Sequence, residues 1–317
     1  AERTTVSFKM MAIGVEAMSM LSNPTFLFYQ FMNSISLGMN LFIIATGLTL
    51  ILGVLRVINF AHGAFFMFGA YVCWSTVTFL GGAVGSFWLG VVAAAVVLGA
   101  MAFVIERGLL RYLYGREHLT QLLFTFAIVL IVGDVAKMIW GTDQYNVPYP
   151  HGLGGAVDFG FAKYPSYPLL LCVIGLVVAV GMWLALSKTR WGRIIRAATQ
   201  DREMLAALGM NVPLVYTGVF VIGSALAGIG GALAAPRVAV SPGMDATIII
   251  ECFIIVIIGG LGSLWGSFLG ALALGFVTMF GTVIFPDWEL VLAYILMLGL
   301  LLWRPWGLFG HEEEEPH

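Results

Sequence analysis

The chain has 317 residues, of which 60% are hydrophobic and only 10% are charged, whereas about 25% of the residues in an average soluble domain are charged. Its mean hydropathy is +0.98. The net charge of -2 and the absence of a basic patch outside the short loops exclude a nucleic-acid-binding protein. This composition predicts an all-α integral membrane protein.

Residues 1–27 precede the first long apolar run. Polar and acidic residues interrupt the apolar stretch behind Arg3 and Lys9, which makes a cleaved signal peptide a poor fit. We interpret residues 1–27 as an N-terminal extension, in which 8–21 is an amphipathic interfacial segment.

Apolar windows along the rest of the chain predict eight or nine transmembrane helices. The windows are 26–52, 63–81, 86–105, 119–139, 166–186, 214–235, 246–262, 264–285 and 288–303. The first is long enough to contain a span and a break. The glycine-rich segment 259–266 predicts either a tight turn or a discontinuity within a helix.

The distribution of Lys and Arg predicts the orientation. Loop 106–117 carries three Arg and loop 187–213 carries five basic residues, whereas 140–165 carries one. By the positive-inside rule the first two loops and the acidic tail 311–317 are cytoplasmic, and 140–165 is outside. The start of the first window then lies outside, which conflicts with the basic residues before it. Either the N-terminal segment lies along a surface, or the first window hides an extra membrane passage.

Three polar residues interrupt the apolar pattern between residues 53 and 71: Arg56, Asn59 and His62. One interpretation is structural, with Arg56 as an interface anchor at a helix end and the other two capping the next helix. The alternative is functional, because polar groups at membrane depth usually face a cavity or another helix. Asn59, Phe60 and His62 are therefore candidates for a translocation path.

A single carboxylate, Glu251, interrupts the window 246–262. It is either functional or the buried partner of a group on a neighbouring helix. Gly259 and Gly260 follow it and are also candidates for the path. The spacing of the glycines beyond them, at positions 262, 266 and 270, favours close helix packing.

The segment 187–213 is too long for a simple turn. Its RIIRAATQDREMLAALG core has apolar residues at helical spacing and predicts one or two short helices, which Gly209 and Pro213 terminate. A charged amphipathic helix suits docking to a soluble partner, although a helix lying on the membrane surface has the same pattern.

The sequence contains no enzyme motif. It has no P-loop, no HExxH and no GxSxG. The three cysteines lie in apolar segments without metal-ligand spacing. We expect no catalytic residue, no metal and no cofactor in this chain.

Four motifs occur in a specific order: RVINFAHG, RAATQDREMLAALG, GGLGSLWGS and RPWGLFG. In this combination the chain resembles the LivH-like permease subunit of bacterial branched-chain amino acid importers of the ATP-binding cassette (ABC) class. The resemblance covers nearly the whole chain from about residue 28. Residues 1–27 are longer than the usual start of such a permease.

The resemblance implies an ABC importer permease fold over 28–310, with broken helices near the midline, in the bacterial inner membrane. It implies a second, LivM-like permease, two LivG/LivF-like cytoplasmic ATPases that hold ATP and Mg, and a periplasmic solute-binding protein. Loop 187–213 is then the ATPase-coupling loop. The coupling residues are Arg190, Arg196, Asp201, Ala207, Leu208 and Gly209.

Three alternatives stay open at this point. A permease of the same family could carry urea, short amides or another small carboxylate. A secondary transporter or channel could work alone, with Glu251 or Asp134 as its proton or ion site. A scaffold membrane protein would tolerate changes in loop 187–213 without loss of solute uptake.

Overall fold

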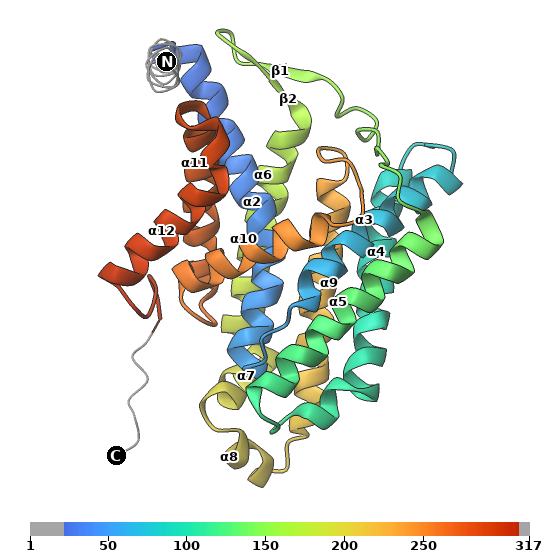
Figure 1. Cartoon of the computed structure of the whole chain (residues 1–317), viewed down its shortest axis with the longest axis vertical. Helices are drawn as coiled ribbons and strands as arrows, with labels where there is room; N and C mark the ends of the chain where they lie inside the picture. Colours follow the sequence, from blue (N-terminus) through green and yellow to red (C-terminus); the bar gives the residue numbers. More distant parts are fainter. Residues whose placement is uncertain (1–21, 311–317) are drawn as a thin grey trace, which may run out of the picture.

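A computed structural model describes residues 22–310, which form a bundle of helices and one short hairpin (Figure 1). The helices are α2 (Pro24–Leu55), α3 (Ala61–Phe79), α4 (Ser86–Gly108), α5 (His118–Trp140), α6 (Ser166–Lys188), α7 (Arg190–Gln200), α8 (Arg202–Ala207), α9 (Val212–Ala234), α10 (Met244–Gly259), α11 (Leu264–Ile284) and α12 (Glu289–Trp303), with the 3-10 turns η1 (Leu110–Leu113) and η2 (Pro286–Trp288). The predicted interfacial segment 8–21 and the acidic tail 311–317 lie outside the described residues.

Helix α2 is continuous over 32 residues, so the first apolar window contains no break. Asn23 caps its start by accepting hydrogen bonds from the amides of Thr25 at 3.0 Å and Phe26 at 3.4 Å. The helix ends where Arg56 adopts the left-handed conformation, at φ 53° and ψ 30°. The helix is therefore interrupted after the first window and not within it. The non-helical segment is 56–60, in the region that the polar residues Arg56, Asn59 and His62 indicated.

The two ends of the bundle differ in structure. One end, here called the hairpin end, carries strands β1 (Ala156–Asp158) and β2 (Lys163–Pro165), which pair antiparallel with Ala156 opposite Pro165. The opposite end, here called the α7–α8 end, carries these two short helices (Figure 1). Helices α2 and α6 run from the hairpin end to the α7–α8 end, and α9 returns. This is the alternation that the charge distribution predicted.

Six of the described helices are long and apolar enough to cross a membrane. They are α2, α4, α5, α6, α9 and α11. Helix α10 has 16 residues, or about 24 Å at 1.5 Å per residue, which is short of the roughly 30 Å hydrocarbon core. Figure 1 shows it crossing the bundle at mid-height instead of running along it. Each predicted window holds a helix.

Glycines allow the central helices to touch backbone to backbone. A Cβ atom added to Gly47 of α2 would lie 2.3 Å from the Gly223 carbonyl oxygen of α9, and one added to Gly69 of α3 would lie 2.5 Å from Gly228. These distances are impossible for real side chains, so α2, α3 and α9 depend on the missing Cβ atoms for their approach.

The segment 259–266 is a tight turn between α10 and α11. Ser263 caps α11 by accepting a hydrogen bond from the Gly266 amide at 3.1 Å. The C-terminal RPWGLFG motif docks onto this turn, with the Leu308 amide donating to the Ile258 carbonyl at 2.9 Å and the Phe309 amide donating to the Gly259 carbonyl at 3.1 Å. Two motifs that are about 45 residues apart in the sequence thus form one structural unit.

Candidate functional site

The first candidate site is the segment 56–60 between α2 and α3, which ends at the mid-height of the bundle. Gly47 of α2 lies close to two residues: a Cβ added to it would be 2.9 Å from His62 Cε1 and 2.3 Å from the carbonyl oxygen of Gly223. Gly223 is the central residue of α9 (Val212–Ala234). The first turn of α3 therefore sits level with the middle of a spanning helix. Non-helical backbone at this depth is tolerated only inside protein or beside a water-filled cavity.

Asn59 and His62 are fully buried in this segment. His62 Nε2 lies 2.8 Å from the Ile44 carbonyl oxygen of α2. Helix α3 begins at Ala61 with Phe60 at the N-cap position and has no side-chain cap, so the interpretation that Asn59 and His62 cap it is wrong. Within the described residues, neither side-chain polar atom of Asn59 has a hydrogen-bond partner. A buried amide left in this way costs about 1–3 kcal/mol, which marks Asn59 as a functional candidate.

Phe60 joins this segment to α10. Its ring lies 5.1 Å from the ring of Phe253, centroid to centroid. A Cβ added to Gly63 would lie 2.5 Å from the carbonyl oxygen of Asp245, in the first turn of α10. Glu251 lies on α10 and is half-buried. The structure therefore brings residues 56–63 and α10 together at the centre of the bundle.

Gly259 and Gly260 occupy packed positions at the end of α10. A Cβ added to Gly259 would lie 2.4 Å from the carbonyl carbon of Gly266, and one added to Gly260 would lie 2.5 Å from the Gly310 amide nitrogen. These contacts support helix packing as the role of both glycines.

The second candidate site is α7 and α8, which form the predicted coupling segment. Thr189 caps α7 by accepting a hydrogen bond from the Gly192 amide at 3.0 Å. Ile195 and Ala198 are buried beneath the helix. Arg190 begins the helix and is exposed, and the guanidinium of Arg196 donates to the Leu186 carbonyl at the end of α6. One face of α7 thus holds it against the bundle.

Helix α8 is capped at both ends. Asp201 Oδ1 accepts hydrogen bonds from the Glu203 and Met204 amides, both at 2.9 Å. At the other end the Gly209 amide donates to the Ala206 carbonyl at 3.0 Å, and the next amide donates to the Leu205 carbonyl at 3.3 Å. This pair is a Schellman motif, with Gly209 at φ 82°. Gly209 therefore terminates the helix as predicted.

Part of the exposed surface at α8 is apolar. Leu208 is 74% exposed and Met204 is 59% exposed, and Ala207 between them is exposed too. Neighbouring exposed apolar side chains on a capped helix at one end of a bundle indicate a candidate protein-docking surface.

A buried carboxylate at the α7–α8 end escaped the sequence analysis. Glu106 is fully buried near the end of α4, where its Oε2 accepts a hydrogen bond from Thr217 Oγ1 of α9 at 2.6 Å and its Oε1 accepts one from the Tyr114 hydroxyl at 3.1 Å. Burial, together with this carboxylate, raises the pKa of the Tyr114 phenol well above its usual value. Glu106 therefore ties together α4, α9 and the loop that contains η1.

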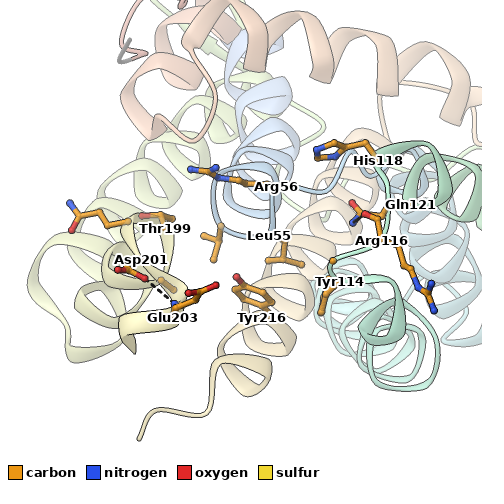
Figure 2. A pocket seen from close by; sticks show the side chains of 14 residues that line it. Leu55, Arg56, Tyr114, Arg116, His118, Gln121, Thr199, Asp201, Glu203 and Tyr216 are labelled. Carbon is orange, nitrogen blue, oxygen red and sulfur yellow. Dashed lines mark hydrogen bonds between the residues drawn. The ribbon is translucent and has the colours of Figure 1, made fainter. Parts of the chain in front are cut away.

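A cavity of about 470 Å³ opens beside this cluster (Figure 2). Its walls come from the end of α2, the loop before α5, the first turn of α5, the segment α7–α8 and α9. Val54, Leu55, Tyr114, Ala198 and Tyr216 supply apolar surface, and Arg56, Arg116, His118, Gln121, Thr199, Gln200, Asp201 and Glu203 supply polar groups.

The family model and the three relatives described next all carry the description of a branched-chain amino acid transport permease. The family described as branched-chain amino acid transport system / permease component matches residues 30–301. The chain is 32% identical to the high-affinity branched-chain amino acid transport system permease protein BraD of Pseudomonas aeruginosa, over 90% of this chain and 96% of that protein. It is 26% identical to the corresponding LivH of Escherichia coli, with the same coverage. It is 27% identical to a probable LivH of Methanocaldococcus jannaschii, over 85% and 88%. No solved structure matches the chain significantly.

Proposed function

Because the chain belongs to the branched-chain amino acid transport system permease family, and is a membrane permease component without enzymatic activity of its own, we propose that it is one permease of an ABC importer for branched-chain amino acids. A second, LivM-like permease completes the path. Two LivG/LivF-like ATPases bind and hydrolyse ATP with Mg, and a periplasmic binding protein delivers the amino acid.

The observation that carries this proposal is the surface of α8. The helix is fixed by Asp201 and Gly209 but exposes Met204 and Leu208. Water is a poor solvent for two large apolar side chains on a capped helix. A soluble ATPase that packs against α8 would bury these side chains. A movement of the ATPase would then displace α8 and α9 as one body.

The proposal fixes an orientation in the bacterial inner membrane. The α7–α8 end, with its basic residues, faces the cytoplasm, and residues 311–317 lie on that side too. The hairpin end faces the periplasm and receives the binding protein.

In this proposal the path runs beside the segment 56–60 and α10. Two features support it: both are interruptions of regular spanning structure at mid-height, and both carry polar groups, Asn59 and Glu251. Amino acid transport needs partners for an ammonium and a carboxylate, which broken helix ends supply. The rings of Phe60 and Phe253 are in contact in this region, and the proposal requires the two elements to separate during transport.

The decisive experiment reconstitutes this permease into liposomes with its co-purified subunits and its binding protein. We expect leucine uptake that requires ATP, and recovery of two P-loop ATPases with the chain. Replacement of both exposed apolar residues, Met204→Ser with Leu208→Ser, should release the ATPases. The matched control is Leu302→Ser, at a position that is 88% exposed on α12, and should retain them. ATP-independent flux by the chain alone would overturn the proposal.

A further inference from the structure

The cavity at the α7–α8 end has opposite charges on facing walls. Arg56, at the end of α2, lies on one side, and Asp201 and Glu203, at the start of α8, lie on the other (Figure 2). The floor between them contains Leu55 and the Tyr216 ring. A second arginine, Arg116, also lines the cavity. Two cations, two carboxylates and an apolar floor together complement a molecule that has a carboxylate, an ammonium group and an aliphatic side chain.

Arg56 has an unusual backbone at this position. It is the one non-glycine residue with positive φ among residues 22–310. This conformation costs an L-residue about 1–2 kcal/mol, and such strain concentrates at ligand sites and switches. The left-handed cap directs the exposed side chain out of the line of α2, at the rim of the cavity (Figure 2).

Size and charge both favour a small zwitterion over other ligands. A volume of about 470 Å³ falls within the range of small-molecule sites, about 300–1,000 Å³. A polyanion such as a nucleotide would meet the two carboxylates of Asp201 and Glu203, and an apolar molecule would leave the four charged groups that line the cavity without partners. Because these groups are exposed, binding would be weak, on the order of millimolar.

We propose that this cavity is a cytoplasmic regulatory site that binds a free aliphatic amino acid and thereby inhibits transport. The carboxylate of the amino acid pairs with Arg56, and its ammonium pairs with Asp201 and Glu203. The inference rests on the proposed function for the direction of transport. The site lies at the α7–α8 end of the bundle, where the segment 56–60 begins, whereas the contact of this segment with α10 is made by Phe60 at its other end.

Inhibition follows from which elements the ligand joins. Arg56 belongs to α2, whereas Asp201 and Glu203 belong to the coupling segment. A ligand that bridges them binds best to the arrangement seen here and less well to one in which α8 has moved. It therefore shifts the population toward this state. The accumulated product of import would slow further import.

The test uses proteoliposomes that contain the complete transporter, with leucine sealed on the cytoplasmic side. We expect internal leucine at millimolar concentration to lower both ATP hydrolysis and uptake. Leucinamide, which lacks the carboxylate, and 4-methylvalerate, which lacks the ammonium group, should inhibit at least tenfold less. Each rate is expressed relative to the same variant without internal ligand.

Variants at Arg56 locate the effect. Arg56→Asn removes the charge but tolerates the left-handed conformation, and should weaken inhibition by leucine at least tenfold. Arg56→Lys retains a cation and should retain much of the inhibition. Arg107→Gln, an exposed arginine outside the cavity, is the control and should behave like the wild type.

The outcomes separate this inference from the proposed function. ATP-driven uptake that is insensitive to internal leucine would overturn the regulatory site and leave the importer intact. Inhibition that is equal in the wild type and in Arg56→Asn would also overturn it, because the leucine would then act within the translocation path. A lack of ATP-driven uptake by any preparation would instead refute the importer itself.

Discussion

The Schellman motif at the end of α8 allows a graded test of the coupling segment. Gly209 has φ 82°, and a Cβ atom added to it meets no heavy atom within 4 Å. A substitution therefore introduces backbone strain without a steric clash. Asn tolerates the left-handed region, Ala is disfavoured by about 1–2 kcal/mol, and a β-branched residue is disfavoured most.

A penalty of one or two kcal/mol changes the population of the native cap by a factor of about 5–30. Since α8 has only six residues, loss of this cap should displace Leu208 and the docking surface. We expect the ratio of amino acid imported to ATP hydrolysed to fall in the order Gly209→Asn, Gly209→Ala, Gly209→Val. Membrane insertion should be normal in all three variants, because the position is exposed.

The measurement is uptake and ATP hydrolysis in the same proteoliposomes, with subunit stoichiometry checked for each variant. The matched control is Gly152→Ala, because Gly152 has nearly the same φ, 84°, and equally open surroundings but lies in the loop at the hairpin end. If Gly209→Val coupled as well as the wild type in a fully assembled complex, the reasoning from the cap to coupling would be refuted.

Three further predictions test the packing. Glu106→Leu removes the acceptor of the buried Thr217 hydroxyl and of the partly buried Tyr114 hydroxyl, and should lower stability by about 1–3 kcal/mol. The measurement is thermal unfolding in detergent, in which Glu106→Gln should cost less. Gly266→Ala places a Cβ 1.9 Å from the Gly259 carbonyl oxygen and should prevent α10 and α11 from packing; its control, Gly133→Ala, meets open space and should fold normally. Tyr164→Phe loses the 2.8 Å hydrogen bond from the Tyr164 hydroxyl to Asn33. The loss should lower stability by about 0.5–1.5 kcal/mol without changing uptake. Because burial raises the pKa of Tyr164 to about 12, the hydroxyl keeps its proton and the wild-type bond should persist across neutral pH.

Hydropathy and charge located the helices because both patterns are local. Each apolar window contains a helix, and the alternation of basic loops gave the relative direction of the spans. The exact position of the first break was less accessible. Arg56 ends α2 by adopting a left-handed backbone conformation. Glycine and asparagine favour this conformation, so an arginine at this position does not predict it.

Tertiary contacts account for the features that the sequence did not predict. The window 246–262 is as apolar as a spanning helix, and only its contacts with α2, α3 and α11 make α10 cross the bundle. Glu106 lies at the edge of a basic loop, so the sequence alone does not distinguish it from an exposed charged residue of that loop. Its partner Thr217 is 111 residues away, and no local pattern connects them. The Schellman glycine, by contrast, was predictable from the sequence around it.

Contacts within the bundle connect α8, which carries the proposed docking surface, with the helix break at residues 56–60. Helix α8 leads through Gly209 directly into α9, and Thr217 of α9 is tied to α4 through Glu106. A force on α8 therefore acts on α9 and α4 as a unit. At its centre α9 presents Gly223 to Gly47 of α2, in contact with the ring of His62. Close-packed backbones at this point transmit displacement instead of absorbing it, since no flexible side chain separates them. If the proposed docking of an ATPase moves α8, the glycines that hold the bundle together would thus also carry that motion to the segment 56–62.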